Sequence, residues 1–246
     1  MIGKKKIIWS LMAAVLLTGV LGIYWFYIAK PAPLPEQERM VKEINGQQPE
    51  AKAVEIQERI QIDGRHAVAP FKSDTGAYGI SHWVWKWHEW GLEGIRTKGD
   101  PRIWKIDPSD PSSFHFIWNI DPEERVETIE YYLMRDRNYS ISGGEEQYIP
   151  SIRLKKGVSM NEKPYGAMKV PAEWSAILKQ NSGGNHKKPA SLFADFHQIP
   201  HLTFGWHPLD EGGEDAYPKS AMNGSTYYSG DLNEEFLMPL NTSDVE

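Results

Sequence analysis

Cysteine is absent from this 246-residue chain. Structural disulfides, thiolate catalysis, cysteine-ligated zinc and acylation of a lipoprotein cysteine are therefore all excluded. The sequence also lacks a Gly-x-Ser-x-Gly elbow, a phosphate-binding loop and a dinucleotide fingerprint. It therefore carries no signature of the hydrolases, nucleotidases or dehydrogenases that use those motifs.

Basic residues are also fewer than acidic ones. The chain has 27 lysines and arginines against 33 acidic residues, which gives a formal net charge of −6. Three of the lysines are Lys4, Lys5 and Lys6 at the extreme N-terminus, so the remainder of the chain is more acidic still. An acidic body disfavours nucleic acid and anionic lipid headgroups as partners, unless a local patch makes the contact. We expect no nucleic-acid partner.

One long uncharged, mainly apolar run extends from Ile7 to Ala29. As a helix it would span roughly 34 Å, enough to cross a hydrocarbon core of about 30 Å. Trp9 lies near its start, and Tyr24 and Trp25 lie near its end, where aromatic residues meet the membrane interface. The run therefore predicts a transmembrane helix over residues 7–29, with the lipid bilayer as a partner.

The lysines before the run outnumber the one that follows closely, Lys30, which keeps residues 1–6 in the cytoplasm. The alternative is a cleaved signal peptide, whose apolar region is usually about 7–15 residues long and ends at small residues. This run is longer and ends in bulky aromatics, which favours a single-pass anchor in the cell membrane. A cysteine-free body outside that membrane fits a bacterium better than a eukaryotic secretory route.

Beyond the anchor, the sequence predicts a stalk and one folded domain. Prolines stiffen the start of residues 30–59, which we interpret as an extracytoplasmic stalk. Short apolar runs between Gly, Pro and Asp turns predict a mainly β globular domain over 60–240, an antiparallel sandwich or barrel with one or two short helices, followed by a frayed tail at 241–246. A helix is expected after Pro171. The strand candidates are 82–90, 103–106, 114–120, 126–135, 148–154, 165–170 and 202–206.

Four tryptophans, Trp83, Trp85, Trp87 and Trp90, form the first candidate site. In a strand, the first three would project from one face, and an exposed row of flat rings could stack on sugars of a wall polymer. The alternative is that the rings fill the core while His82 and its neighbours on the opposite face meet water. The regular alternation favours the core interpretation.

Three histidines, His197, His201 and His207, lie close together in the sequence with Asp195 nearby. Neutral imidazoles and a carboxylate could bind Zn²⁺ or a similar divalent ion, although their spacing matches no zinc-protease motif. The alternative is that they are ordinary surface or hydrogen-bonding histidines. Apart from such an ion, no cofactor is expected.

Three aromatic stretches carry a resemblance to known proteins: Tyr78–Lys86, Trp104–Asp107 and Phe114–Ile120. Over roughly residues 66–178 the sequence resembles uncharacterised single-pass envelope proteins of low-GC Gram-positive bacteria. The resemblance implies a cell-envelope setting and lends no catalytic residues. We therefore expect a membrane-anchored extracytoplasmic protein that binds an envelope protein or a wall polymer. The alternative is a metal-dependent envelope hydrolase that uses the histidine segment.

Overall fold

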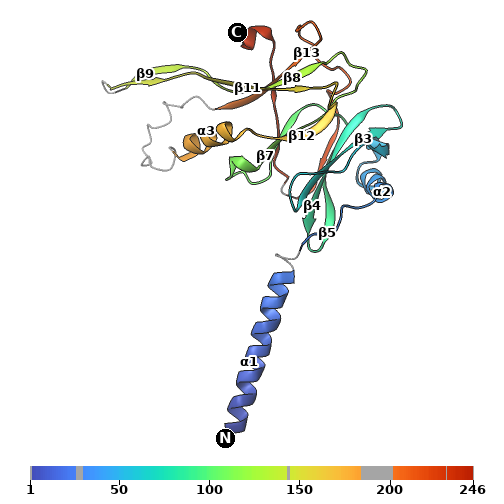
Figure 1. Cartoon of the computed structure of the whole chain (residues 1–246), viewed down its shortest axis with the longest axis vertical. Helices are drawn as coiled ribbons and strands as arrows, with labels where there is room; N and C mark the ends of the chain where they lie inside the picture. Colours follow the sequence, from blue (N-terminus) through green and yellow to red (C-terminus); the bar gives the residue numbers. More distant parts are fainter. Residues whose placement is uncertain (1, 26–29, 143–144, 184–201, 231, 246) are drawn as a thin grey trace.

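The computed structural model describes residues 2–25, 30–142, 145–183, 202–230 and 232–245. The fold is mainly β, as the sequence predicts, with largely antiparallel sheets and few helices (Figure 1). The helices are α1 (Ile2–Ile23), α2 (Gln37–Gln47), α3 (Ala172–Gly183) and α4 (Thr242–Val245), with short 3-10 turns at Pro49–Ala51 and Pro111–Ser113. Within the described part of the chain, no helix combines the length and the apolar character needed to cross a membrane.

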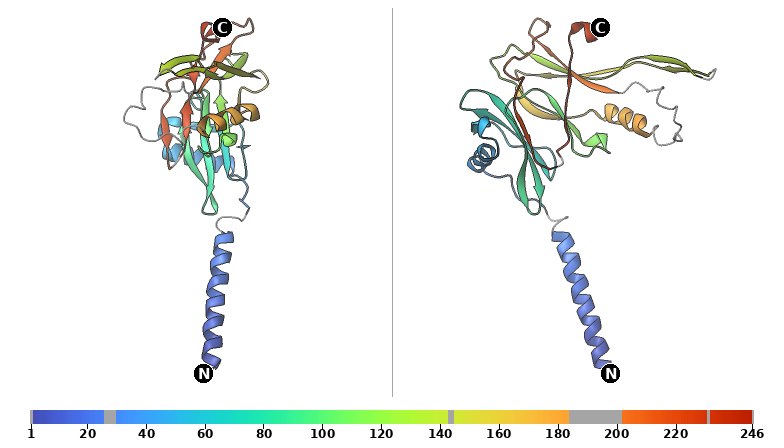
Figure 2. Two further views of the ribbon diagram at one scale, coloured as in Figure 1. Left: turned by 90° about the vertical axis from the view of Figure 1, so that its left-hand side faces the viewer. Right: turned by 180° about the vertical axis from the view of Figure 1, so that it is seen from behind.

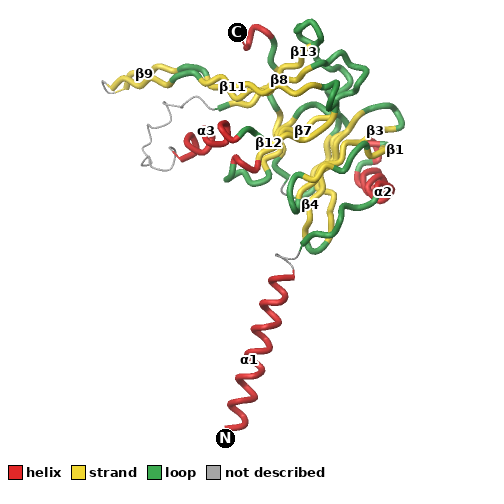
Figure 3. The backbone as a smooth tube through the Cα atoms, viewed as in Figure 1, coloured by secondary structure: helices red, strands yellow, loops and turns green. Residues whose placement is uncertain are grey.

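Three sheets build the body, and a separate two-stranded hairpin projects from it (Figure 3). The first sheet contains β1 (Ala53–Ile56), β2 (Ile60–Gln61), β3 (His66–Ser73), β4 (Tyr78–Lys86), β5 (Glu89–Arg96) and β14 (Thr226–Tyr228). The middle sheet contains β12 (Tyr165–Lys169), β7 (Phe114–Asn119), β6 (Arg102–Lys105) and β15 (Glu234–Phe236). The third sheet contains β11 (Ile152–Ser159), β8 (Thr128–Arg135), β13 (Thr203–Leu209) and β16 (Met238–Pro239), and the hairpin is β9 (Asn138–Ser142) with β10 (Glu145–Ile149).

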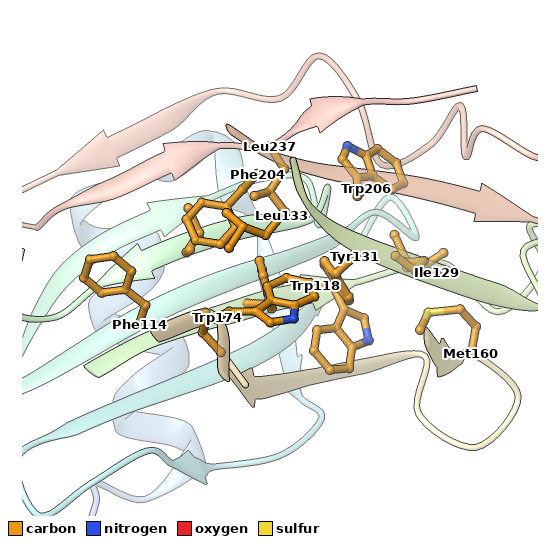
Figure 4. Close-up of a cluster of buried hydrophobic side chains, with 14 of the residues drawn as sticks. Phe114, Trp118, Ile129, Tyr131, Leu133, Met160, Trp174, Phe204, Trp206 and Leu237 are labelled. Atoms are coloured by element: carbon orange, nitrogen blue, oxygen red, sulfur yellow. The ribbon is translucent and has the colours of Figure 1, made fainter. Parts of the chain in front are cut away.

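The middle sheet is buried on both faces. Successive side chains of β7 point to opposite sides of the sheet, and each side meets a different core. Phe116 and Trp118 enter the core between the middle and third sheets. Trp174 of α3 and Tyr131 of β8 enter the same core, as Figure 4 shows with Trp118. Ile117 enters a second core, shared with the first sheet. The middle sheet therefore holds the other two sheets together through separate apolar contacts.

Helix α2 covers the outer face of the first sheet. Met40 and Ile44, one helical turn apart, are fully buried there against Phe71 and Trp83. The predicted stalk over 30–59 is therefore wrong from α2 onward, since α2, β1 and the turn between them belong to the body. The apolar residues of this segment form no long periodic pattern in the sequence, because its helix is short and its strand buries only its two end residues.

The C-terminal segment contributes one strand to each of the three sheets. β14 pairs with β5 of the first sheet, β15 with β6 of the middle sheet, and β16 lies parallel to β13 of the third. Beyond it, the predicted frayed tail is wrong for residues 242–245, which form α4. Thr242 Oγ1 donates a hydrogen bond of 2.9 Å to Asp215, which fixes the start of this helix.

Candidate functional site

The candidate tryptophans do not share one strand. Because the chain turns at Trp87 and His88, the expected strand over 82–90 is two strands, β4 and β5. Trp83, Trp85 and Trp90 are buried, as the core interpretation predicted, and the four rings form no continuous exposed row. Trp87 differs, with 71% of its surface exposed.

The opposite face of β4 does not meet water either. His82 is fully buried, contrary to expectation, because the middle sheet covers this face. Its ring lies edge-on to Trp104 of β6, with 5.0 Å between the ring centroids. A histidine buried among apolar side chains needs a polar partner, and Glu234 of β15 provides one.

A buried ionic cluster joins the first and middle sheets. Glu234 Oε1 lies 3.1 Å from His82 Nε2, and Glu234 Oε2 lies 3.1 Å from Arg96 Nε. The Tyr228 hydroxyl donates to Glu234 Oε2 at 2.5 Å. Arg96 also pairs with Asp100, which in turn accepts from Arg102. Such a network stabilises one arrangement of the strands that carry it.

Opposing effects set the pKa of the Glu234 carboxyl. Burial raises this pKa, but the charges of Arg96 and His82 and the hydrogen bonds from His82 and Tyr228 outweigh burial and hold the pKa at about 2. Glu234 is therefore a carboxylate at neutral pH, which matches its role as the acceptor at the centre of the cluster. No sequence pattern marks this set, because its members come from strands far apart in the chain.

The candidate metal ligands are placed only in part. His197, His201 and Asp195 lie outside the described residues. His207 is buried on β13, where its Nε2 atom lies 2.7 Å from Asp215 Oδ1. The bond to His207 lowers the pKa of the Asp215 carboxyl. Because one ring nitrogen of His207 is engaged and the other is buried, the described contacts fit the hydrogen-bonding interpretation of this residue.

An open groove of about 530 Å³ lies beside His207. Glu130 lines it and accepts hydrogen bonds from Lys155 and Tyr132. Burial raises the pKa of Glu130, yet its two partners lower it overall, so this carboxylate is a poor proton acceptor. Among the residues with described positions, no group of three or more acidic or histidine side chains is arranged to hold a metal ion.

Outside α1, an exposed apolar surface lies on the β9–β10 hairpin. This hairpin continues the β8–β11 ribbon beyond a break at Pro150 and extends away from the body (Figure 1). The expected strand over 148–154 is therefore two strands, because Pro150 has no N–H to donate to a ladder.

One face of the hairpin carries three large side chains. Tyr139 pairs with Tyr148 across the ladder, and Ile141 pairs with Glu146, so all four side chains share a face. We call this set the hairpin face. Its tyrosines and isoleucine are each more than half exposed. The predicted strands include Tyr148 but leave out Tyr139 and Ile141, although these two residues alternate with polar ones as in a half-buried strand.

No family model, curated protein or solved structure matches the chain.

Proposed function

We propose that the chain is a single-pass membrane protein whose extracytoplasmic, sandwich-like body presents the hairpin face to a partner protein of the cell envelope. The observation that carries this proposal is the exposure of Tyr139, Ile141 and Tyr148 on a hairpin that projects from the body.

Support for the anchor comes from the sequence and from exposure. The apolar run continues past the end of α1 through residues 26–29, which lie outside the described part, to Ala29. Apolar side chains are exposed on all sides of α1 rather than along one stripe, which is typical of a helix surrounded by lipid. They are Ile8, Leu11, Met12, Val15, Leu16, Leu17, Val20 and Leu21.

Support for the direction of insertion comes from charge. Lys4, Lys5 and Lys6 precede the apolar run, and lysines are retained on the cytoplasmic side. The body that follows α1 then lies outside the cytoplasm, which agrees with a chain free of cysteine.

Support for a protein partner comes from the physics of the hairpin. An isolated two-stranded ribbon is only marginally stable in water, and here its exposed face is apolar. Burying that face against another protein would remove apolar surface from water and order the ribbon. Tyrosine is enriched in such contacts because it provides large rigid area with a polar tip.

Photo-crosslinking in intact membranes tests the proposal. A photoreactive amino acid is introduced at Glu146, which lies in the hairpin face and leaves the apolar side chains intact. We expect one dominant covalent adduct with an envelope protein. The substitutions Tyr139→Ser, Ile141→Ser and Tyr148→Ser, combined in one chain, should abolish the adduct.

A matched control uses exposed apolar residues elsewhere. Val54 on β1 and Phe236 on β15 are also more than half exposed, and Val54→Ser with Phe236→Ser should leave the adduct unchanged. If the triple hairpin variant gives the same adduct in the same yield as the unaltered chain, the hairpin is not the binding surface.

A further inference from the structure

The tight turn between β4 and β5 lies directly at the C-terminal end of α1 in both views of Figure 2. The Trp25 and His88 rings are stacked with their centroids 4.8 Å apart, and His88 Nε2 also contacts the Trp25 carbonyl oxygen. A second contact follows the chain out of α1, because Trp90 Nε1 donates to the Ala32 carbonyl at 2.8 Å. These contacts hold the turn beside the end of the apolar run.

The turn itself displays a large aromatic side chain. Lys86 pairs with Glu89, so Trp87 and His88 are the two central residues, with φ angles of 54° and 65°. Both angles lie in the left-handed region, where such turns favour Asn-Gly. The sequence instead has Trp-His here, and 71% of the Trp87 surface is exposed. This choice of residues is poor for the turn and brings a large indole ring to the surface.

We propose that Trp87 inserts into the headgroup layer of the bilayer that holds α1, as a second membrane contact. This inference rests on the proposed anchoring of α1. Indole rings favour the membrane–water interface, because they combine a broad apolar face with one N–H donor. Tyr24 and Trp25 are exposed at the same end of α1, so Trp87 extends an aromatic cluster already placed there.

The charged residues around the turn do not favour anionic lipid headgroups. Lys86 is paired with Glu93 at 3.2 Å, and Glu89 at the other end of the turn is exposed. The contact therefore depends on the aromatic ring rather than on attraction to anionic lipid. It would hold the first sheet toward the membrane, while the β9–β10 hairpin extends sideways from the opposite end of the body (Figure 1).

Spin labelling tests this contact, and the absence of cysteine makes single-site labelling direct. The full chain is reconstituted in phosphatidylcholine vesicles with one nitroxide at Glu89→Cys, which leaves Trp87 intact. Collision of the label with oxygen, which concentrates in lipid, is compared with collision with a water-soluble nickel complex. Two reference positions are Val15→Cys in α1 and Tyr148→Cys on the hairpin.

We expect the ratio of oxygen to nickel collisions at residue 89 to lie between the two references. Adding Trp87→Ser should lower it severalfold, to the value at residue 148. If the label at residue 15 lies in lipid but the ratio at residue 89 equals that at residue 148, Trp87 makes no membrane contact. The proposed anchoring of α1 is then unaffected. A water-exposed label at residue 15 overturns the anchor, and the contact with it. A label at 89 that soluble wall glycans immobilise and lipid does not would also overturn the inference.

Discussion

Arg96 Nε lies 3.1 Å from Glu234 Oε2, although β5 and β15 belong to different sheets. Both side chains are almost completely removed from water, and His82 contacts the second oxygen of the same carboxylate. A guanidinium and a carboxylate this deeply buried are costly unless paired, so Arg96 and Glu234 depend on each other. The pair therefore holds the C-terminal segment against the first sheet.

Replacing Glu234 with glutamine should destabilise the fold by about 3 kcal/mol, because the guanidinium of Arg96 loses its countercharge in a buried site. Asp100 still pairs with Arg96, so the loss falls short of complete unfolding. Denaturant unfolding of the full chain in detergent micelles, followed by near-ultraviolet circular dichroism, measures the change.

The adjacent residue provides the matched control. Glu235 pairs with Lys105 at 2.5 Å, but more than half of its side chain is exposed. Glu235→Gln should change the free energy of unfolding by less than about 1 kcal/mol, because water already screens such a pair. Equal losses in the free energy of unfolding for the two variants would show that burial does not make the Glu234 cluster more stabilising than an exposed ion pair.

Acid should destabilise the protein through the same carboxylate. Its pKa of about 2 in the folded chain lies below the ordinary 4.5, so Glu234 contributes stability above pH 4.5 that disappears as pH falls toward 2. The depressed pKa corresponds to about 3 kcal/mol. Unfolding measured between pH 7 and pH 2 should show this decline, and Glu234→Gln should flatten it. A decline of the same size in the variant would assign it to other carboxylates.

The two ends of the C-terminal segment should differ sharply in their tolerance of truncation. Ending the chain after Asn223 removes β14, β15 and β16, one strand from each sheet, and should abolish cooperative unfolding. Ending it after Asn241 removes only α4 and its bonds to Asp215, and should leave the unfolding midpoint nearly unchanged. Near-ultraviolet circular dichroism distinguishes the outcomes, and a cooperative transition in the shorter chain would contradict the assignment.

The sequence predicted what local periodicity can encode. The short apolar run at 114–120, between turn residues, predicted β7, and Pro171 predicted the start of α3. The sequence could not reveal that both faces of β4 are covered, because the middle sheet that buries His82 is assembled from distant segments. The partner of His82, Glu234, is 152 residues away and outside every predicted strand, so no spacing rule finds it. The segment of α2 was assigned to the stalk rather than to the core, because its charged residues outnumber its two buried ones.

Residues that suit the β4–β5 turn better should raise the free energy of unfolding but remove the membrane contact. Trp87→Asn combined with His88→Gly provides the residues that its positive φ angles favour, and should raise the free energy of unfolding by about 1 kcal/mol. The same variant should release the label at residue 89 into water, since it removes both the indole ring and the His88 ring that stacks on Trp25. Asn223→Gly is the control, because Asn223 also has a positive φ, of 61°, yet asparagine tolerates it and the site is far from α1 in sequence. That control should gain little stability and leave the label in its original environment. A double variant less stable than the unaltered chain would mean that packing of Trp87 and His88 within the chain, rather than contact with lipid, explains these residues.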